Sequence, residues 1–159
     1  MIAVVDADSP ERIALAKALF LEYVATPEVD VCMEDFATEI AGLPGQYAPP
    51  AGALLLALED DRPVGCVALR ALDPPYGEMK RLYVRPEERG KRIGDALVAA
   101  LVLRARAAGF AAVRLDTLPS MASAQALYRR LGFAIIPPYP TRPIPGALHY
   151  ELGLTVDAR

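Results

Sequence analysis

The feature that most constrains this chain is a strand, a basic glycine-containing loop and a helix that follow one another directly. Residues 79–84 form a β-like run, which stops at Pro86. The loop Arg89-Gly90-Lys91-Arg92 comes next, and a helix is predicted over residues 93–108. Its apolar residues recur with helical spacing at Ile93, Leu97, Leu101 and Ala105. Such a turn directs several unpaired N–H groups one way, at the positive end of the helix dipole, and therefore predicts a site for a phosphate-bearing ligand.

Composition narrows the class of protein. The 159 residues are 53% hydrophobic, which suits one domain, residues 1–159, with a substantial core. The net charge of −3 does not suggest a nucleic-acid partner, and the basic cluster at 85–92 is local, as in small-anion sites. No apolar run reaches the length of a membrane span, and no signal-peptide pattern opens the chain. A soluble, cytoplasmic protein without a membrane partner is predicted.

Apolar periodicity and breaking residues predict the order of elements. Helices are expected from Pro10 to before Pro27 and over residues 30–42, 93–108 and 121–131, and strands over 2–5, 53–59, 64–72, 77–85, 112–115, 133–136 and 149–154. Residues 137–145 hold five prolines and read as a rigid loop, with a ligand for a polyproline-binding module as the alternative. A strand meander that precedes a βαβ unit predicts an α/β fold with a mixed sheet and helices on its faces.

Two motifs and this element order together resemble the GNAT superfamily of acyl-CoA-dependent N-acetyltransferases. The first motif is Arg89-Gly90-Lys91-Arg92-Ile93-Gly94, which is similar to the family's pyrophosphate loop. The second is Ala124 to Phe133, with its Ala, Leu-Tyr and Gly-Phe at the family's spacing. The resemblance covers nearly the whole chain. It implies a mixed, mostly antiparallel seven-stranded sheet with splayed central parallel strands and about four helices on its faces.

Two positions depart from the family pattern. Arg92 stands where the loop usually has glycine, which restricts the backbone conformation there but leaves its N–H available. Met121 stands where an asparagine often contacts the cofactor, and Ser120 or Ser123 is the available polar substitute.

The resemblance implies that acetyl-CoA is the cosubstrate and that no metal takes part. The backbone N–H groups of Gly90 to Asp95 would hold the CoA pyrophosphate, and the pantetheine arm would enter between the strands at 79–84 and 113–117. The cofactor-binding residues implied are Leu82, Tyr83, Val84, Arg89, Gly90, Lys91, Arg92, Ile93, Gly94, Asp95 and Tyr128. An N–H on the first of these strands would polarise the thioester carbonyl.

The catalytic residues that the resemblance implies are Glu78 and Tyr128. Tyr128 would protonate the departing thiolate of CoA, and Glu78 would take the proton of the attacking amine. His149, the single histidine, and a chain of water molecules are the alternatives for the base. Cys32 and Cys66 lie outside both motifs, so we expect buried free thiols and no covalent enzyme intermediate.

The acceptor is expected opposite the CoA arm, between the first two helices and the loops at 43–50 and 137–145. The polar and aromatic residues available there are Glu34, Asp35, Gln46, Tyr47, Tyr139 and His149. The sequence leaves the acceptor open between a small amine, an amino acid and a protein amino group. Members of the family often dimerise, so a homodimer is compatible with the resemblance. A CoA-binding sensor with little turnover and a protein that binds another anion are the alternative functions.

Overall fold

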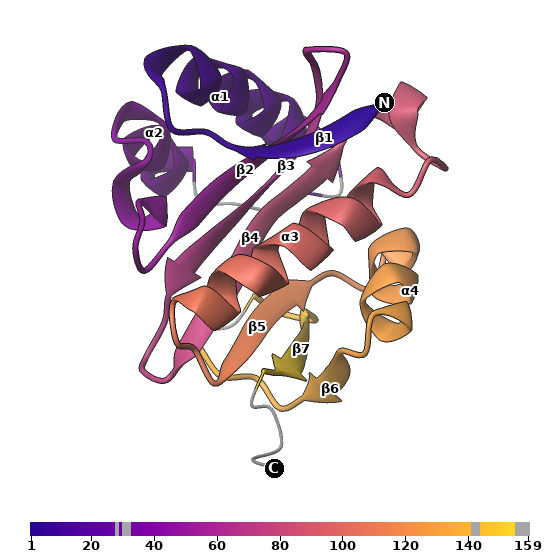
Figure 1. Cartoon of the computed structure of the whole chain (residues 1–159). Coiled ribbons are helices and arrows are strands. Elements are labelled where there is room, and N and C mark those ends of the chain that lie inside the picture. The colour runs from indigo at the N-terminus through magenta and orange to yellow at the C-terminus, as the bar shows by residue number, and fades with distance from the viewer. Residues whose placement is uncertain (28, 30–32, 141–143, 155–159) are drawn as a thin grey trace.

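The computed structural model describes residues 1–27, 29, 33–140 and 144–154. Its strands form one seven-stranded sheet in the order β1-β2-β3-β4-β5-β7-β6 (Figure 1). The strands are β1 (Ile2–Asp6), β2 (Ala53–Glu59), β3 (Arg62–Ala71), β4 (Tyr76–Val84), β5 (Ala112–Thr117), β6 (Ala134–Ile136) and β7 (Leu148–Gly153). The α-helices in the described residues are α1 (Pro10–Val24), α2 (Met33–Ala41), α3 (Ile93–Ala107) and α4 (Ala122–Arg130).

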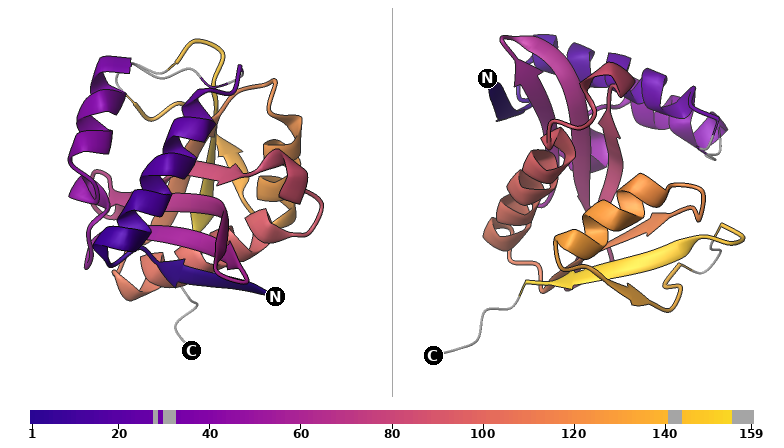
Figure 2. Two further views of the ribbon diagram at one scale, coloured as in Figure 1. Left: turned by 90° about the horizontal axis from the view of Figure 1, so that it is seen from above. Right: turned by 90° about the vertical axis from the view of Figure 1, so that its right-hand side faces the viewer.

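Helices cover both faces of the sheet, and each face has its own apolar core. Phe20 of α1 and Phe36 of α2 pack with Leu54 and Leu56 of β2 on one face. On the other face α3 and α4 pack against the strands, with residues such as Leu97, Leu101, Val113, Leu115, Leu127 and Tyr150. Figure 2 shows α1 and α2 on the opposite side of the sheet from α3. Strand alternation explains this division, because neighbouring residues of one strand point to opposite faces.

The central strands β4 and β5 pair over a short stretch and then part. They form the parallel pair of the sheet, in which Tyr76, Gly77 and Glu78 face Ala112, Val113 and Arg114. Beyond Glu78 and Arg114 no further register pairs join them, although both strands continue. The right-hand view of Figure 2 shows the two halves of the sheet diverging from this point. The predicted fold class, a mostly antiparallel sheet with splayed parallel strands, is confirmed.

A bulge interrupts β4 just past the fork. Cys66 of β3 faces Tyr83 and Ala68 faces Lys80, so β4 holds one more residue than β3 over this stretch. Arg81, inside the bulge, has a φ of 63°, a left-handed conformation that is strained for a residue with a side chain. The bulge therefore changes the direction of the backbone where the free edge of β4 begins.

Most predicted elements lie within two residues of their observed bounds. Gly109 and Gly132 follow α3 and α4 with φ of 87° and 98°, as expected of glycines that end helices. Ser9 caps α1 by accepting a hydrogen bond from the N–H of Arg12. Two short 3₁₀ turns, Gly45–Tyr47 and Pro86–Glu88, were not predicted. The predicted start of the second helix at residue 30 lies outside the described residues.

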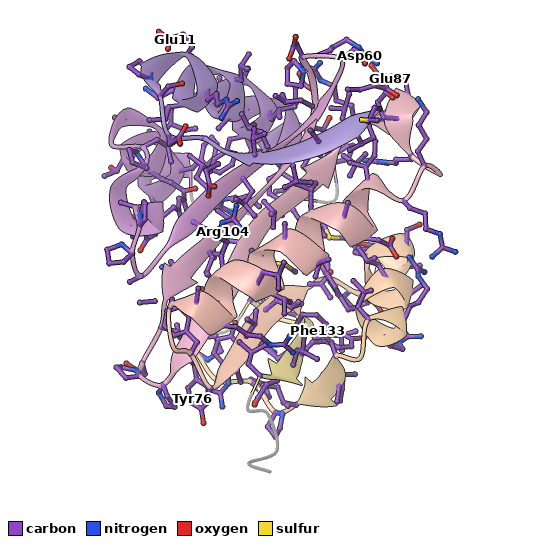
Figure 3. The ribbon with its side chains drawn as sticks, in the orientation of Figure 1. Glu11, Asp60, Tyr76, Glu87, Arg104 and Phe133 are labelled. Carbon is purple, nitrogen blue, oxygen red and sulfur yellow. The ribbon has the colours of Figure 1, made fainter. Side chains whose placement is uncertain are left out.

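Long-range ion pairs connect the layers. Arg104 projects from α3 toward β1 and binds the carboxylate of Asp6 through two nitrogens, at 2.8 and 3.1 Å (Figure 3). Arg85, just after β4, binds Glu22 of α1 at 2.6 Å. None of the described helices is sufficiently long and apolar to pass through a lipid bilayer.

Candidate functional site

A cavity of about 680 Å³ occupies the space into which β4 and β5 part. Its walls are the free edge of β4, the end of β5, the first turn of α3 and the length of α4. The residues that the sequence analysis assigned to a cofactor and that line this cavity are Leu82, Tyr83, Val84, Arg89, Gly90, Arg92, Ile93, Gly94, Asp95 and Tyr128. The parting of two neighbouring strands thus creates a cleft with unpaired strand edges along its sides.

The loop before α3 leaves the first N–H groups of the helix unoccupied by side chains. Arg92 is the N-cap residue and makes no side-chain cap hydrogen bond. Its φ of 62° and ψ of 27° are left-handed, which explains why a glycine suits this position and why arginine carries some strain here. Gly90 also has a positive φ, 88°. The helix therefore offers unsatisfied donors at its positive end to an anion in the cavity.

Three guanidinium groups surround this helix end. Arg89, Arg92 and Arg130 line the cavity, and Arg130 of α4 was not predicted. Arg130 binds Asp95 of α3 at 2.9 Å, and Arg92 lies 3.5 Å from the same carboxylate. Asp95 thereby holds two of the cations beside the free N–H groups. Arg130 belongs to the second motif, Ala124 to Phe133, but the sequence does not show that it lies near the loop. The packing of α4 on α3 brings it there.

Lys91, by contrast, is not among the residues that line this cavity. Its ammonium donates to Glu88 at 2.7 Å, and Arg62 binds the other oxygen of Glu88 at 2.8 Å. These two cations lower the pKa of Glu88 to about 2. Lys91 also lies 3.7 Å from Glu59 of β2, so it ties the loop to the β2–β3 end of the sheet.

Gly94 lies where α3 approaches both β4 and α4. A Cβ at this position would stand 3.3 Å from Leu127 and 3.9 Å from Val84, both of which line the cavity. A methyl group would need a small shift of the flexible Leu127 side chain. A larger or charged side chain would extend into the cavity beside the free N–H groups.

Tyr128 of α4 contributes a protonated hydroxyl to the cavity. Its ring packs at 5.8 Å from Phe133 and 5.9 Å from Tyr150, between centroids, and Figure 3 shows where Phe133 lies. Burial, reinforced by nearby Tyr23 and Asp116, raises the pKa of Tyr128. Within the described part of the chain its hydroxyl makes no hydrogen bond, so the proton is available to a ligand.

A second cavity, of about 710 Å³, lies on the α1 and α2 side of the same fork. Asp35, Gln46 and Tyr47, three of the residues expected near an acceptor, line it. The two cavities share walls, and the residues common to both are Tyr23, Val29, Lys80, Arg81, Asp116, Thr117 and Met121. A ligand in one cavity can therefore meet a ligand in the other along this shared seam.

Glu78 lies at the fork but lines neither cavity. Its side chain is buried and both oxygens are engaged. Arg70 binds Oε1 at 2.6 Å, and the Tyr139 hydroxyl donates to Oε2 at 2.5 Å. His149, the alternative base, is also buried and packs edge-on to Tyr139, with its Nε2 unpaired in the described structure. The Glu78 carboxylate therefore reaches a ligand only through a partner group.

Asp116 was not singled out from the sequence, and it lies on the shared seam. It belongs to β5, two residues beyond Arg114, at which pairing with β4 ends. Among the described residues no cation lies within ion-pair distance of its carboxylate and no hydrogen bond reaches it. An uncompensated carboxylate where two cavities meet suits an ammonium group or a proton in transit. In the sequence Asp116 alternates with apolar or small residues, as polar residues of a strand ordinarily do. The sequence alone therefore did not indicate a functional role for Asp116.

The bulge in β4 is held from behind by an ion pair. Arg81 binds Glu39 of α2 through two nitrogens, at 2.7 and 2.9 Å, and both side chains are about nine-tenths buried. Burial alone would raise the pKa of Glu39, but hydrogen bonds from Arg81 and its charge lower it overall. Cys66 donates its thiol to the Arg81 carbonyl at 3.4 Å, and burial raises the pKa of that thiol. Cys66 is thus a buried free thiol, as predicted.

Other predicted residues fall into three groups. Ser120 and Ser123, the expected substitutes for an asparagine, both line the first cavity. Tyr139 and His149 line neither cavity: Tyr139 donates to Glu78 at the fork, and His149 packs against the Tyr139 ring. Cys32 and the side chain of Glu34 lie outside the described residues. In the described ranges no group of three His, Cys, Asp or Glu residues is arranged to hold a metal ion.

Comparison with known proteins agrees with this geometry. The model of the acetyltransferase (GNAT) family matches residues 16–133. An uncharacterized N-acetyltransferase of Schizosaccharomyces pombe is 34% identical over 148 residues, which cover 92% of this chain and 91% of that protein.

Solved structures share the fold. A GNAT-family acetyltransferase from Staphylococcus aureus aligns with a TM-score of 0.82 at 18% identity, covering 98% of this chain and all of that one. A Salmonella typhimurium structure with its cofactor acetyl-CoA aligns with a TM-score of 0.72 at 18% identity, covering 100% of this chain and 97% of that one.

The ion pair behind the bulge generates a stability prediction. Glu39→Gln leaves the Arg81 guanidinium buried without a counter-charge, so we expect the free energy of unfolding at pH 7 to fall by about 3 kcal/mol. Because the pKa of Glu39 in the folded protein lies below its ordinary 4.5, the stabilisation is present above that value and is lost as the pH falls further. Denaturant unfolding from pH 7 to pH 3 should show wild type and variant converging.

The exposed pair Asp8–Arg12, 3.6 Å apart, provides the control. Asp8→Asn should change the free energy of unfolding by less than about 1 kcal/mol. Equal effects of the two substitutions would show that the Glu39–Arg81 pair does not hold the bulge.

Proposed function

The chain belongs to the acetyltransferase (GNAT) family, and on that premise we propose that it transfers the acetyl group of acetyl-CoA directly to a primary amine. The observation that carries the proposal is the cleft between β4 and β5, which leads from the N-terminus of α3 to the seam with the second cavity. The acetyl-CoA in the Salmonella typhimurium structure of the same fold supports this choice of cosubstrate. We treat residues 1–159 as one domain, and we place the reaction in the cytoplasm, where acetyl-CoA is available.

In this proposal the diphosphate of CoA binds the backbone N–H groups of residues 90–95. Arg89, Arg92 and Arg130 supply positive charge around it, and the Asp95 carboxylate keeps two of these cations in place. The pantetheine arm then follows the free edge of β4 at Leu82, Tyr83 and Val84, where its amides take the hydrogen bonds that β5 no longer makes. The thioester is thereby directed toward the seam.

The bulge in β4 is the proposed site of carbonyl polarisation. A backbone N–H that is directed into the cleft would donate to the thioester oxygen as negative charge develops on it. Arg81 in its left-handed conformation, fixed by Glu39 and Cys66, gives this part of the strand a defined orientation. The strained backbone at Arg81 then helps to fix the direction of the N–H group that donates to the thioester oxygen.

Tyr128 is the proposed general acid. Because its pKa is raised, the phenol stays protonated at neutral pH and can give its proton to the departing CoA thiolate. The amine nitrogen forms a bond to the carbonyl carbon while the carbon–sulfur bond breaks. Cys66, the free thiol among the described residues, takes no part, since it is buried and bound to the Arg81 carbonyl.

Two carboxylates are candidates to take the proton of the attacking amine. Glu78, which the family resemblance favours, would act through Tyr139, because both its oxygens already accept hydrogen bonds. Asp116 lines both cavities and has no cationic partner among the described residues, so it can receive the proton directly. We propose Asp116 as the proton acceptor, with Glu78 fixing Arg70 and Tyr139 beside it.

The placement of the diphosphate can be tested with Gly94→Glu. The new carboxylate would extend toward Leu127 and Val84 and repel the diphosphate, so we expect acetyl-CoA affinity to fall at least about 100-fold by calorimetry. Gly94→Ala is the control and should retain affinity within about threefold. Tight binding by a folded Gly94→Glu protein would place the diphosphate elsewhere. CoA binding without thiol release for any amine tested would favour a CoA sensor.

Tyr128→Phe tests the general acid. We expect kcat to fall on the order of 100-fold with little change in acetyl-CoA affinity, because only the proton donor is removed. Tyr150→Phe is the matched control: its buried hydroxyl has no partner in the described structure, and its ring packs on Tyr128. If both variants turned over at the wild-type rate, the Tyr128 phenol would be purely structural.

Turnover separates the two carboxylates. The group that takes the proton of the amine acts on the substrate directly, so its removal lowers kcat/KM the most. We expect Asp116→Asn to lower kcat/KM on the order of 100-fold, whereas Glu78→Gln lowers it less than about tenfold. The reverse pattern would return the base role to Glu78.

A further inference from the structure

The second cavity contains two charges that the described residues compensate weakly or not at all, and they lie on the two parting strands. The other charges on its inner wall are paired: Arg81 with Glu39 at 2.7 Å, and Arg70 with Glu78 at 2.6 Å. Asp35 is exposed on α2. Lys80 of β4 and Asp116 of β5 remain, and both line the seam between the cavities.

Lys80 has only a weak internal partner. Its ammonium lies 4.0 Å from Oε1 of Glu78, an oxygen that Arg70 already binds at 2.6 Å. Asp116, as described above, has no cationic partner within the described ranges. Among the described residues the same opening thus holds an anion without a cationic partner and a cation whose contact with Glu78 is a long 4.0 Å.

The register explains why these two groups stay apart. Glu78 faces Arg114 in the last parallel pair, and the next residues on the same face are Lys80 and Asp116. If the strands had continued to pair, the ammonium and the carboxylate would have been neighbours able to form an ion pair. Because the strands part there, the two charges face the fork from opposite sides.

We propose that this pair of charges selects an α-amino acid with a free carboxylate as the acetyl acceptor. The proposal rests on the acetyl transfer proposed above and names its substrate class. The acceptor's ammonium binds Asp116, and its carboxylate binds Lys80. In an α-amino acid the two groups are separated by one carbon, so one small molecule complements both strands and replaces the missing ion pair.

The cavity fits the remainder of such a substrate. Its volume of about 710 Å³ leaves ample room for a side chain beyond the backbone atoms at the seam. Apolar residues form much of the wall away from the seam: Phe36, Leu43, Pro44, Leu118 and Ile144. We therefore expect a large apolar or aromatic amino acid to be preferred over glycine or aspartate.

Every bond and proton of the acetyl transfer can be accounted for in this binding mode. The ammonium gives one proton to Asp116 and the neutral nitrogen bonds to the acetyl carbonyl carbon. The carbon–sulfur bond breaks, Tyr128 protonates the thiolate, and the nitrogen loses its second proton to solvent as the amide forms. Lys80 takes no part in the chemistry; it positions the carboxylate. A protein lysine has no carboxylate beside its amine and would leave Lys80 uncompensated.

The test compares three forms of one acceptor by CoA thiol release. After the twenty L-amino acids are screened, the best substrate is compared with its amide and with its decarboxylated amine. We expect kcat/KM to be at least about tenfold higher for the free acid than for either analogue. The amine of the amide is the less protonated, so intrinsic reactivity would favour the amide. Equal or better turnover of the amide would overturn the proposal.

Variants of Lys80 test whether this residue causes the preference for the free acid over the amide. Lys80→Met should remove the preference by lowering kcat/KM for the free acid while leaving the amide unchanged, and Lys80→Arg should largely retain it. Lys17→Met, which removes the same charge from α1 outside both cavities, should change nothing. If Lys80→Met lowered turnover of acid and amide equally, Lys80 would have a general role and the proposal would fail.

Failure of acetyl transfer itself is recognised separately. In that case no amine releases thiol, and calorimetric titration of the CoA-loaded protein with the same three compounds decides the inference. Binding of free amino acids, weakened about tenfold or more by Lys80→Met, supports the carboxylate site. Absence of binding, or binding indifferent to Lys80, overturns it.

Discussion

The parting of β4 and β5 is the constraint on which the rest of the structure depends. Three register pairs hold these strands together, and beyond them each strand has a free edge. Those edges border one cavity and open onto the other, so the fork creates both the cleft and the seam where its contents meet. Strand edges are usually covered because unpaired N–H and C=O groups attract other strands. Here an extended ligand arm would satisfy them.

Buried ion pairs keep the fork in its shape. Arg70, Glu78 and Tyr139 connect β3, β4 and the loop after β6 at the point where the strands separate, and Arg81 with Glu39 fixes the bulge to α2. Such pairs add little net stability over apolar packing, but removing one partner leaves an unpaired charge. They therefore specify one backbone arrangement rather than strengthen the fold, which suits a site that depends on orientation.

The sequence predicted the fold, and it identified the loop before α3 as the candidate anion-binding end of the site, because both depend on local signals. The loop at 89–94, the helix after it and the glycines that end α3 and α4 have conformations set by neighbours in sequence. The seam was harder to predict, because Asp116 and Lys80 come together only where two strands meet in three dimensions, and Arg130 likewise reaches the loop only through the packing of α4 on α3. Glu78 shows the same limit, since its position matched a family pattern but its partner Tyr139 is 61 residues away in sequence.

The geometry of the seam also bears on the order of events in the proposed reaction. The cavities share a few residues, so the thioester and the amine can meet only if both cavities are filled at once. A relay through a protein thiol would need a reactive cysteine at this place, yet the free thiol of the described residues, Cys66, has a pKa raised by burial and donates its hydrogen bond to the backbone. A ternary complex is therefore the arrangement that this architecture favours, and the pairs around Glu78 and Arg81 fix its walls before either ligand arrives.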